Sequence, residues 1–454
     1  MHRAAYRLAA RVVHRLPLRK GKLAQSVAGR RGAVERWVEW ARAGRSDAPL
    51  LWVHGASVGE ALTADPVLGR LRSAEPHLQV IHTYSSPSAA AWPEPFSGDR
   101  SDYVPLDEPT SVGRVLDAVR PSLIVFAGGD MWPELAFRAD ERRIPMAVIG
   151  GTVRENSWRL RFPARRLYRE LHSTVSWLGA TSPDDAARWI RLGVAPSTVH
   201  VTGDPRHDQV LERTPRLGPL MELARWATEA STLVAGSVEA SDEAVVIEGA
   251  AVTCRRHPRA RLLVVPHAPA EARLSALAAR AQRAGLAPVA WTPGGAEVVD
   301  SNCVIVGTQG LLFDLYALGS TAYVGGGFRQ GRLHAVVEPA AYGLPVIMGP
   351  HWGQSHDARA VIRSNGGVAL PRRKAAAALT ACWLGWINDE ALRSTAGLAA
   401  RRTLHQGAAS ATARALLELL PGTRARERFE EPVADPRHPE TEAPPPHRPP
   451  SVRR

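Results

Sequence analysis

The stretch Leu51-Trp-Val-His-Gly-Ala-Ser-Val-Gly-Glu60 decides the fold class. Its first half is a short apolar run, which is typical of a strand buried in a parallel sheet. A glycine turn follows, and the residues after the turn have the composition of a helix start. A strand that passes through a tight turn into a helix predicts one β–α unit of a doubly wound sheet.

This unit recurs along the chain, because short apolar runs that end in Gly, Ser or Pro alternate with helix-length segments. The segment Arg213–Pro219 interrupts the alternation and is interpreted as a linker. The sequence therefore predicts an α/β protein with two Rossmann-like doubly wound domains that face a central cleft, with ligands at the carboxyl ends of the strands. The predicted strands are Leu50–His54, Leu78–Tyr84, Leu123–Ala127, Met146–Ile149, Val175–Ala180, Val199–Thr202, Thr232–Ala235, Leu262–Val265, Cys303–Val306, Thr321–Val324 and Val346–Met348.

Four segments follow from this pattern. We expect the first domain to span residues 50–217 and the second to span residues 218–420. Residues 1–49 form a basic segment, in which residues 3–16 fit a short amphipathic helix that either lies on an anionic membrane surface or is a solvated surface helix. Residues 421–454 contain nine prolines and almost nothing apolar, which predicts a disordered tail.

Composition narrows the classes of protein. The 454 residues carry a net charge of +13, which favours an anionic partner such as a membrane surface or a phosphorylated substrate. Nucleic acid is disfavoured, because aromatics are 6 % and the basic excess lies mainly at one end without a nucleic-acid motif. Three widely spaced cysteines indicate a reducing compartment. No run approaches the length of a membrane span, and we recognise no secretory signal.

Two motifs place carboxylates at strand ends of the first domain. Glu60 follows the first strand and would act as a general base on a sugar hydroxyl. The alternative is structural, since Ser57 and Glu60 also fit a capping box, and spacing alone favours that cap. Asp130 and Glu134 follow the strand Leu123–Ala127 and are expected at the cleft rim. The alternative for Asp130 is a cap on the next helix.

Glycine-rich and basic motifs mark the second half of the cleft. Gly325–Gly327 ends a strand, and we expect a helix to begin near Leu333, so that backbone amides approach a phosphate. In a nucleotide-sugar enzyme, Glu338, within the second turn of that helix, would bind ribose hydroxyls. Arg206, in the segment Thr202–Asp208, either forms a fork on a phosphate or is a solvated turn residue.

Two weaker elements follow other strands of the second domain. Ser237 and the pair Pro266-His267 line the same cleft or belong to ordinary loops. His334 and Glu338 lie four residues apart, with His351 and His356 downstream. We expect no metal there, because the spacing is neither HExxH nor a cysteine cluster.

In their order, these motifs resemble those of the 3-deoxy-D-manno-octulosonic acid (Kdo) transferases, from about residue 50 to about residue 410. The family's S-x-G-E motif is matched by Ser57 to Glu60. Its E-x-W-P segment is matched by Asp130 to Pro133, with Asp in place of Glu. The other matched segments are Tyr84–Ser88, Ala180–Arg188 with Leu192 and Gly193, Thr202–Asp208, and Gly331 with His334, Glu338, Pro339 and Ala340.

The resemblance implies a GT-B fold and inverting, metal-independent transfer of Kdo from CMP-Kdo to a lipid A precursor, without a cofactor, at the cytoplasmic face of the inner membrane. It implies that Glu60 deprotonates the acceptor and that Asp130 orients the acceptor or the base. The implied acceptor-binding residues are Ser57, Gly59, Ser86 and Ser88. The implied donor-binding residues are Arg206, Ser237, Pro266, His267, Gly326, Gly327, Gly331, His334 and Glu338.

Three departures leave alternatives open. Ala335 stands where the family usually has asparagine, Gly128 where many members carry a second glutamate, and the family's P-R-H segment survives only as Pro266-His267. The alternatives are another GT-B glycosyltransferase, a sugar-nucleotide epimerase, and a non-catalytic paralogue that binds lipid or nucleotide.

Overall fold

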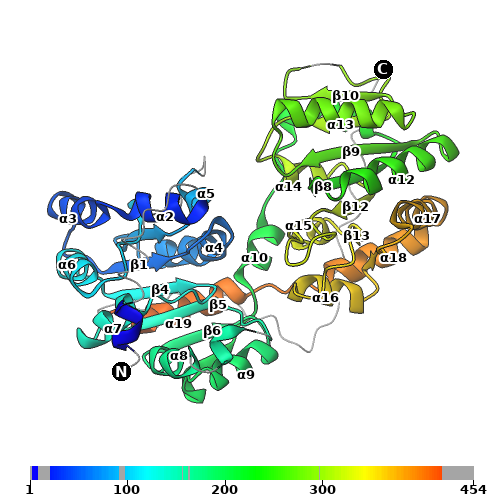
Figure 1. Ribbon diagram of the computed structural model, residues 1–454. Helices are drawn as coiled ribbons and strands as arrows, with labels where there is room; N and C mark the ends of the chain where they lie inside the picture. Colours follow the sequence, from blue (N-terminus) through cyan, green and yellow to red (C-terminus); the bar gives the residue numbers. More distant parts are fainter. Residues whose placement is uncertain are drawn as a thin grey trace.

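A computed structural model describes residues 3–8, 21–91, 98–155, 157–161, 164–295 and 297–421. The chain forms two α/β domains that lie side by side (Figure 1). Each domain contains a seven-stranded parallel sheet, and helices cover both faces of each sheet. The GT-B prediction, two Rossmann-like domains, is therefore confirmed.

The first sheet has the strand order β3-β2-β1-β4-β5-β6-β7. Its central strands β1 and β4 are buried along their whole length, as their apolar sequences predict. Helices α3, α6 and α7 pack on one face, and α4 packs on the other. The strands are β1 Leu50–His54, β2 Gln79–Tyr84, β3 Arg100–Tyr103, β4 Leu123–Ala127, β5 Met146–Gly151, β6 Trp177–Ala180 and β7 Val199–Val201. The helices are α2 Lys22–Arg30, α3 Ala33–Gly44, α4 Val58–Ala74, α5 Pro87–Ala90, α6 Pro109–Val119, α7 Pro133–Glu141, η1 Trp158–Leu160, α8 Ala164–His172, α9 Pro183–Arg191, η2 Pro196–Thr198 and α10 Pro205–Glu212.

The second sheet has the strand order β10-β11-β9-β8-β12-β13-β14. Helices α12, α13 and α17 pack on one face, and α11 and α14 pack on the other. The strands are β8 Ser231–Val238, β9 Ala260–Pro266, β10 Pro288–Trp291, β11 Cys303–Val306, β12 Thr321–Val324, β13 Val346–Met348 and β14 Gly367–Ala369. The helices are η3 Gly218–Leu220, α11 Met221–Ala227, α12 Glu243–Arg256, α13 Glu271–Arg283, α14 Leu312–Tyr316, α15 Val337–Ala341, α16 His356–Arg363, α17 Ala375–Asn388, α18 Glu390–Arg401 and α19 Ala408–Leu419.

All eleven predicted strands are present, and the sequence analysis missed three: β3, β10 and β14. Each missed strand lies at the edge of its sheet. Edge strands pair on one side only and need not be apolar, so β3, with the sequence Arg-Ser-Asp-Tyr, has no hydrophobic pattern to detect.

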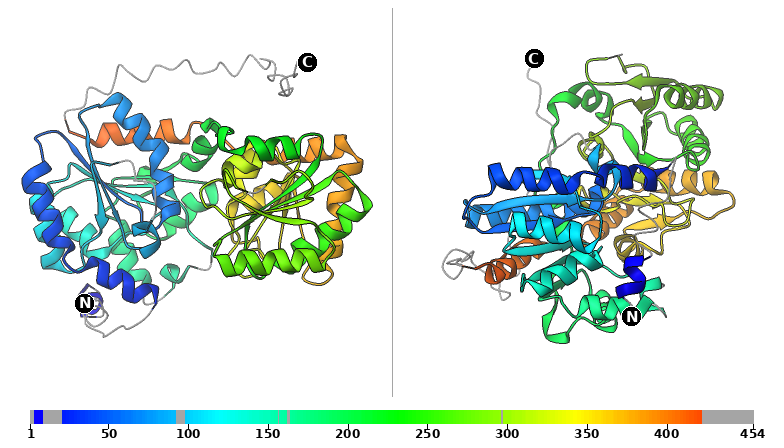
Figure 2. Two further views of the ribbon diagram at one scale, coloured as in Figure 1. Left: turned by 90° about the horizontal axis from the view of Figure 1, so that it is seen from above. Right: turned by 60° about the vertical axis from the view of Figure 1, so that its left-hand side comes forward.

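Helix α19 differs from the predicted domain division, which assigns it to the second domain. Its apolar stripe is buried against α4 in the first domain, with Ala413 and Leu416 at most 1 % exposed (Figure 2). Asp208 of α10 accepts hydrogen bonds from the amides of Gly407 and Ala409 at 2.6 and 2.8 Å. Since the N-cap residue Gly407 has no side chain, Asp208 caps this helix instead.

The basic N-terminal segment is described only at residues 3–8, which are helical; the rest of the predicted helix lies outside the described residues. Arg3 forms an ion pair with Glu170 at 2.8 Å, and Arg7 forms one with Glu134 at 2.7 Å. Tyr6 donates a hydrogen bond to Asp107 at 2.6 Å. These arginines therefore neutralise carboxylates of the first domain. The predicted tail from residue 422 onward also lies outside the described residues.

Within the described ranges, no helix is long and apolar enough to cross a membrane.

Candidate active site

Glu60 occupies the first turn of α4 and takes part in a capping box. Its Oε2 accepts hydrogen bonds from the Ser57 amide at 2.9 Å and from the Ser57 hydroxyl at 3.2 Å. The capping box that the sequence suggested as the structural alternative for Glu60 is therefore present. It does not exclude a chemical role, because the second carboxylate oxygen is left over by these two bonds.

Asp130 lies beside Glu60, and a pair of glycines makes this approach possible. Gly128 has φ of 72°, and a Cβ atom there would lie 3.0 Å from Cγ of Glu60. Gly129 has φ of 93°, and a Cβ atom there would lie 2.5 Å from the Trp189 ring. Only glycine fits both positions without strain. The loop after β4 therefore closes over Glu60 and sets two carboxylates together.

This arrangement changes the protonation of both carboxyl groups. Burial and the neighbouring Asp130 charge raise the pKa of Glu60 to about 7, although the Ser57 hydrogen bonds oppose the shift. Burial also raises the pKa of Asp130, and the guanidinium groups of Arg159 and Arg30 counteract it. A carboxyl group that titrates near neutral pH is suited to exchange a proton with a sugar hydroxyl.

Asp130 does not cap helix α7, so the structural alternative for this residue is wrong. Asp107, from the loop before α6, accepts hydrogen bonds from the amides of Glu134 and Leu135 at 3.0 and 3.1 Å. Asp130 instead forms an ion pair with Arg159 at 3.6 Å. The Asp130 side chain is still 40 % exposed, so its carboxylate is accessible near the end of β4.

Glu134 is not at the cleft rim, contrary to the sequence-based expectation. It is completely buried, and Arg7 donates two hydrogen bonds to its carboxylate, at 2.7 and 3.2 Å. Arg138, one helical turn later, lies 3.8 Å away. Its role is to anchor the N-terminal segment.

Two arginines in this region were missed by the sequence analysis. Arg30 is buried, donates to the carbonyls of Val104 and Pro105, and lies 4.1 Å above the Trp132 ring. Arg159 donates to the carbonyl of Gly129 at 2.9 Å. Both come from segments without a motif, so only the tertiary structure reveals that they face Asp130.

The remaining predicted acceptor residues surround the start of α4. The amide of Ser86 donates to the Ala56 carbonyl at 2.9 Å, and the Ser86 hydroxyl caps the short helix α5. Ser88 and Gly59 are exposed. A Cβ atom on Gly59 would meet nothing within 4 Å, so space is open beside Glu60.

In the second domain, glycines let three loops meet at the strand ends. A Cβ atom on Gly325 would lie 2.2 Å from the Ser237 carbonyl oxygen, and one on Gly326 would lie 2.1 Å from that of Arg332. Ser237 itself has φ of 50°, which is strained for a residue with a side chain. A Cβ atom on Gly327 would lie 2.6 Å from the Gly349 amide nitrogen.

Asp242, which the sequence analysis missed, holds these loops together. Its buried carboxylate accepts hydrogen bonds from the Tyr323 hydroxyl and from the amides of Gly326 and Glu239, each at 2.8 Å. Asp242 lies at the start of α12, where an acidic residue is ordinary, so no sequence signal separates it from a surface carboxylate.

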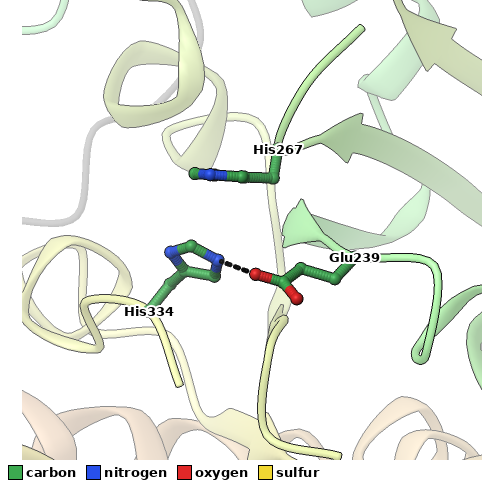
Figure 3. Close-up of side chains that lie close together, drawn as sticks. All are labelled: Glu239, His267 and His334. Atoms are coloured by element: carbon green, nitrogen blue, oxygen red, sulfur yellow. Dashed lines mark hydrogen bonds and ion pairs between the residues drawn. The ribbon is translucent and has the colours of Figure 1, made fainter. Parts of the chain in front are cut away.

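Glu239, His267 and His334 converge at the ends of β8, β9 and β12 (Figure 3). His334 Nε2 lies 3.2 Å from Glu239 Oε1, and the two histidine rings are 4.5 Å apart between centroids. Arg332 donates to the same carboxylate oxygen at 3.0 Å. Burial and His267 lower the pKa of His334, whereas Arg332 and His334 lower the pKa of Glu239 against the effect of burial. His267 follows Pro266, the last residue of β9.

The ligand atoms of this cluster lie within 4.8 Å of one another, as they would around a metal ion. However, the Arg332 guanidinium already binds Glu239 Oε1, and a metal ion would compete with it for that oxygen. Two imidazoles and a guanidinium suit an anion better. The metal set considered from sequence, His334 with Glu338, His351 and His356, is not brought together among the described residues.

Glu338 is separate from this cluster, because α15 begins at Val337 and not near Leu333. The loop that contains His334 is irregular, so His334 and Glu338 do not share a helix. The prediction of a helix that begins near Leu333 is therefore wrong. Gly331 occupies a turn in that loop with φ of 69°. Burial and Asp314 raise the pKa of Glu338 to about 7, against the effect of Arg213.

Arg206 is engaged in ion pairs and does not present a free fork. Its guanidinium binds Asp204, which caps α10, and lies 3.3 Å from Asp357 of α16. The Asp204 charge raises the pKa of Arg206 further above its ordinary value. Arg206 therefore ties α10 to the second domain.

The fold and these two strand-end clusters define the class: an enzyme with the GT-B fold. Solved structures agree on the fold. A putative UDP-N-acetylglucosamine 2-epimerase from Listeria monocytogenes is 12 % identical and superposes with a TM-score of 0.58 over 81 % of this chain and 96 % of that chain.

Sequence comparisons are more specific. Residues 26–209 match the family model described as 3-Deoxy-D-manno-octulosonic-acid transferase (kdotransferase). The 3-deoxy-D-manno-octulosonic acid transferase of Bordetella pertussis is 30 % identical over 335 residues, covering 70 % of this chain and 76 % of the relative. That of Haemophilus influenzae is 23 % identical over 308 residues, covering 66 % and 70 %. The chain therefore belongs to the Kdo transferase family.

Proposed function

We propose that this enzyme transfers Kdo from CMP-Kdo to a lipid A precursor, lipid IVA, with inversion at the anomeric carbon and without a metal ion. The observation that carries the proposal is the carboxylate pair Glu60 and Asp130, which the turns after β1 and β4 set together and in which burial and Asp130 raise the pKa of Glu60 to about 7. Membership of the Kdo transferase family supports Kdo as the transferred sugar. His267, His334 and Arg332 of the second domain form a site that suits a nucleotide phosphate.

The acceptor binds at the first domain, where Ser57, Gly59, Ser86 and Ser88 surround Glu60. Glu60 takes the proton from the acceptor hydroxyl as its oxygen bonds to the anomeric carbon of Kdo. Asp130 orients the hydroxyl and keeps the pKa of Glu60 high enough for it to act as a base. Attack from the face opposite the leaving group inverts the anomeric centre.

The donor binds at the second domain. The bond between the anomeric carbon and the CMP phosphate breaks, and its electron pair leaves with CMP. His267, His334 and Arg332 face the phosphate and stabilise its developing charge. Ser237, Gly326 and Gly327 allow the loops to approach the nucleotide, and Gly331 shapes the turn next to His334. Glu338 lies beside Arg213 and Asp314, and Arg206 is paired with Asp204 and Asp357, so neither is assigned to the donor here.

The departures from the family pattern are compatible with catalysis. Gly128 leaves the space that the Glu60 side chain fills, since a Cβ atom there would crowd Cγ of Glu60. Ala335 is exposed in the loop and supports no described contact of the cluster. A non-catalytic paralogue would not need to keep the Glu60 environment.

The test is direct. Purified enzyme is incubated with CMP-Kdo, generated in place, and tetra-acylated lipid A precursor, and the acceptor is followed by mass spectrometry with and without EDTA. We expect a gain of one or more Kdo units in both arms, and NMR of the product gives the anomeric configuration. A gain that EDTA abolishes would overturn metal independence. No gain from CMP-Kdo, with turnover of a UDP-sugar, would favour a different glycosyltransferase or an epimerase.

A further inference from the structure

The outer face of η1 and α8 carries a dense group of arginines around an exposed tryptophan. Trp158 is 60 % exposed, and its ring packs edge-on against Tyr168 at 5.1 Å. Arg161, Arg165 and Arg169 are also exposed. We name Trp158, Arg161, Arg165 and Arg169 the α8 surface.

The three arginines of the α8 surface lie in one row. The amide of Arg165 donates to the carbonyl of Arg161 at 2.8 Å, which is a helical spacing, and Arg169 follows one turn later on α8. Like charges at this spacing repel one another. Among the described residues, no carboxylate forms an ion pair with any of the three. The row therefore keeps a repulsion that an external anion would relieve.

Nearby basic residues do not share this property. Arg3 and Arg7 of the N-terminal segment are paired with Glu170 and Glu134, so they neutralise the first domain. Arg161, Arg165 and Arg169 have no such carboxylate partner among the described residues. Leu8, which ends the described N-terminal helix, is 65 % exposed.

The α8 surface is also connected to the candidate catalytic carboxylates. Arg159, the residue after Trp158, forms the ion pair with Asp130 and donates to the Gly129 carbonyl. A lipid acceptor has its sugar hydroxyl in the active site while its acyl chains stay in the bilayer. Trp158 is adjacent in sequence to Arg159, the ion-pair partner of Asp130. A membrane contact at Trp158 would therefore keep the active site close to the bilayer.

We propose that the α8 surface docks the enzyme on an anionic lipid bilayer, with the three arginines at the lipid phosphates and Trp158 at the level of the headgroups. The inference deepens the proposed function, on which the choice of a lipid acceptor rests. Charge complementarity favours the bilayer, because exposed arginines bind phosphates and an indole fits the interface between water and acyl chains.

The test measures binding to vesicles of phosphatidylcholine with and without phosphatidylglycerol, in the absence of donor. The variant Arg161→Ala/Arg165→Ala/Arg169→Ala should bind anionic vesicles about 100-fold more weakly, from about 1 kcal/mol for each arginine and 1.4 kcal/mol for each factor of ten. The matched control is Arg256→Ala/Arg259→Ala/Arg283→Ala, which removes the same charge from exposed positions of the second domain. The control should bind like the wild type.

Activity separates this inference from the proposed function. The triple α8 variant should keep its rate on detergent-dispersed acceptor and lose it on vesicle-embedded acceptor. Unchanged vesicle binding by this variant, or an equal loss in the control, would overturn the inference. A loss of activity only on detergent-dispersed acceptor would also overturn the inference, because it would mean that the arginines bind the acceptor's own phosphates. Absence of Kdo transfer by the wild type with intact vesicle binding would overturn the proposed function alone.

Discussion

The two domains repeat one topology but carry opposite chemistry at the ends of their strands. In the first domain the loops after β1 and β4 bring together Glu60 and Asp130. In the second domain the loops after β8, β9 and β12 bring together two histidines and an arginine around Glu239. Parallel strands bring loop residues to a common edge in both cases. The comparison teaches that the fold supplies the position, whereas the loop residues assign one edge to proton transfer and the other to an anion.

The largest effect is expected at the acidic edge. Glu60→Gln removes the base but keeps the cap, because glutamine also serves in a capping box. We expect kcat/KM to fall by about 10²–10⁴-fold, the usual contribution of a general base, with a midpoint of thermal unfolding no lower than that of the wild type. Glu39→Gln, the same substitution at an exposed position of α3, is the control. Activity that survives Glu60→Gln would return Glu60 to a purely structural role.

The second prediction asks whether the two domains have independent cores. Leu416→Ala removes a buried side chain of α19 and should destabilise the first domain by about 2–5 kcal/mol, although the residue lies near the end of the described chain. Hydrogen exchange in β1 and β4 reports the effect. Leu398→Ala, at an exposed position of α18, should change stability by less than about 0.5 kcal/mol. Equal protection of β1 in both variants would show that α19 is not part of this core.

The third prediction concerns the basic edge. His334→Ala should raise the KM for CMP-Kdo about tenfold, which corresponds to one hydrogen bond to a charged group, with a smaller change in kcat. His77→Ala, at an exposed turn of the first domain, should leave both constants unchanged. A fall in kcat at constant KM would instead place His334 in the chemical step.

The smallest effect sharpens the role of Asp130. Glu60 must be ionised to act as a base, so kcat/KM should fall as the pH drops below about 7. Asp130→Asn removes the neighbouring charge that helps to raise this pKa, and the acid limb should move to lower pH. Asp184→Asn, an exposed carboxylate on α9, should leave the limb in place. The raised pKa of Glu60 also affects folding. The free energy of unfolding should decrease as the pH rises from about 4.5 through 7, and Glu60→Gln should remove that decrease.

The sequence predicted what depends on apolar runs and glycine turns, and it failed where partners come from distant segments. The inner strands and the position of Glu60 follow from local pattern. Asp242 and Arg159 could not be found, because an acidic helix start and a lone arginine look the same whether or not they meet a loop. The short α15 was placed too early, because the glycine-rich loop stays irregular up to Val336.

Helix α19 has a consequence for the synthesis of the chain. The ribosome makes residues 50–217 early. The apolar surface that α19 covers, next to α4, stays exposed until residues 408–419 have been made. At about 5–20 residues per second, the roughly 200 intervening residues delay completion of that core by about 10–40 s. The first domain therefore cannot complete its core while it is being synthesised. During this interval we expect it to bind chaperones that recognise exposed apolar surface.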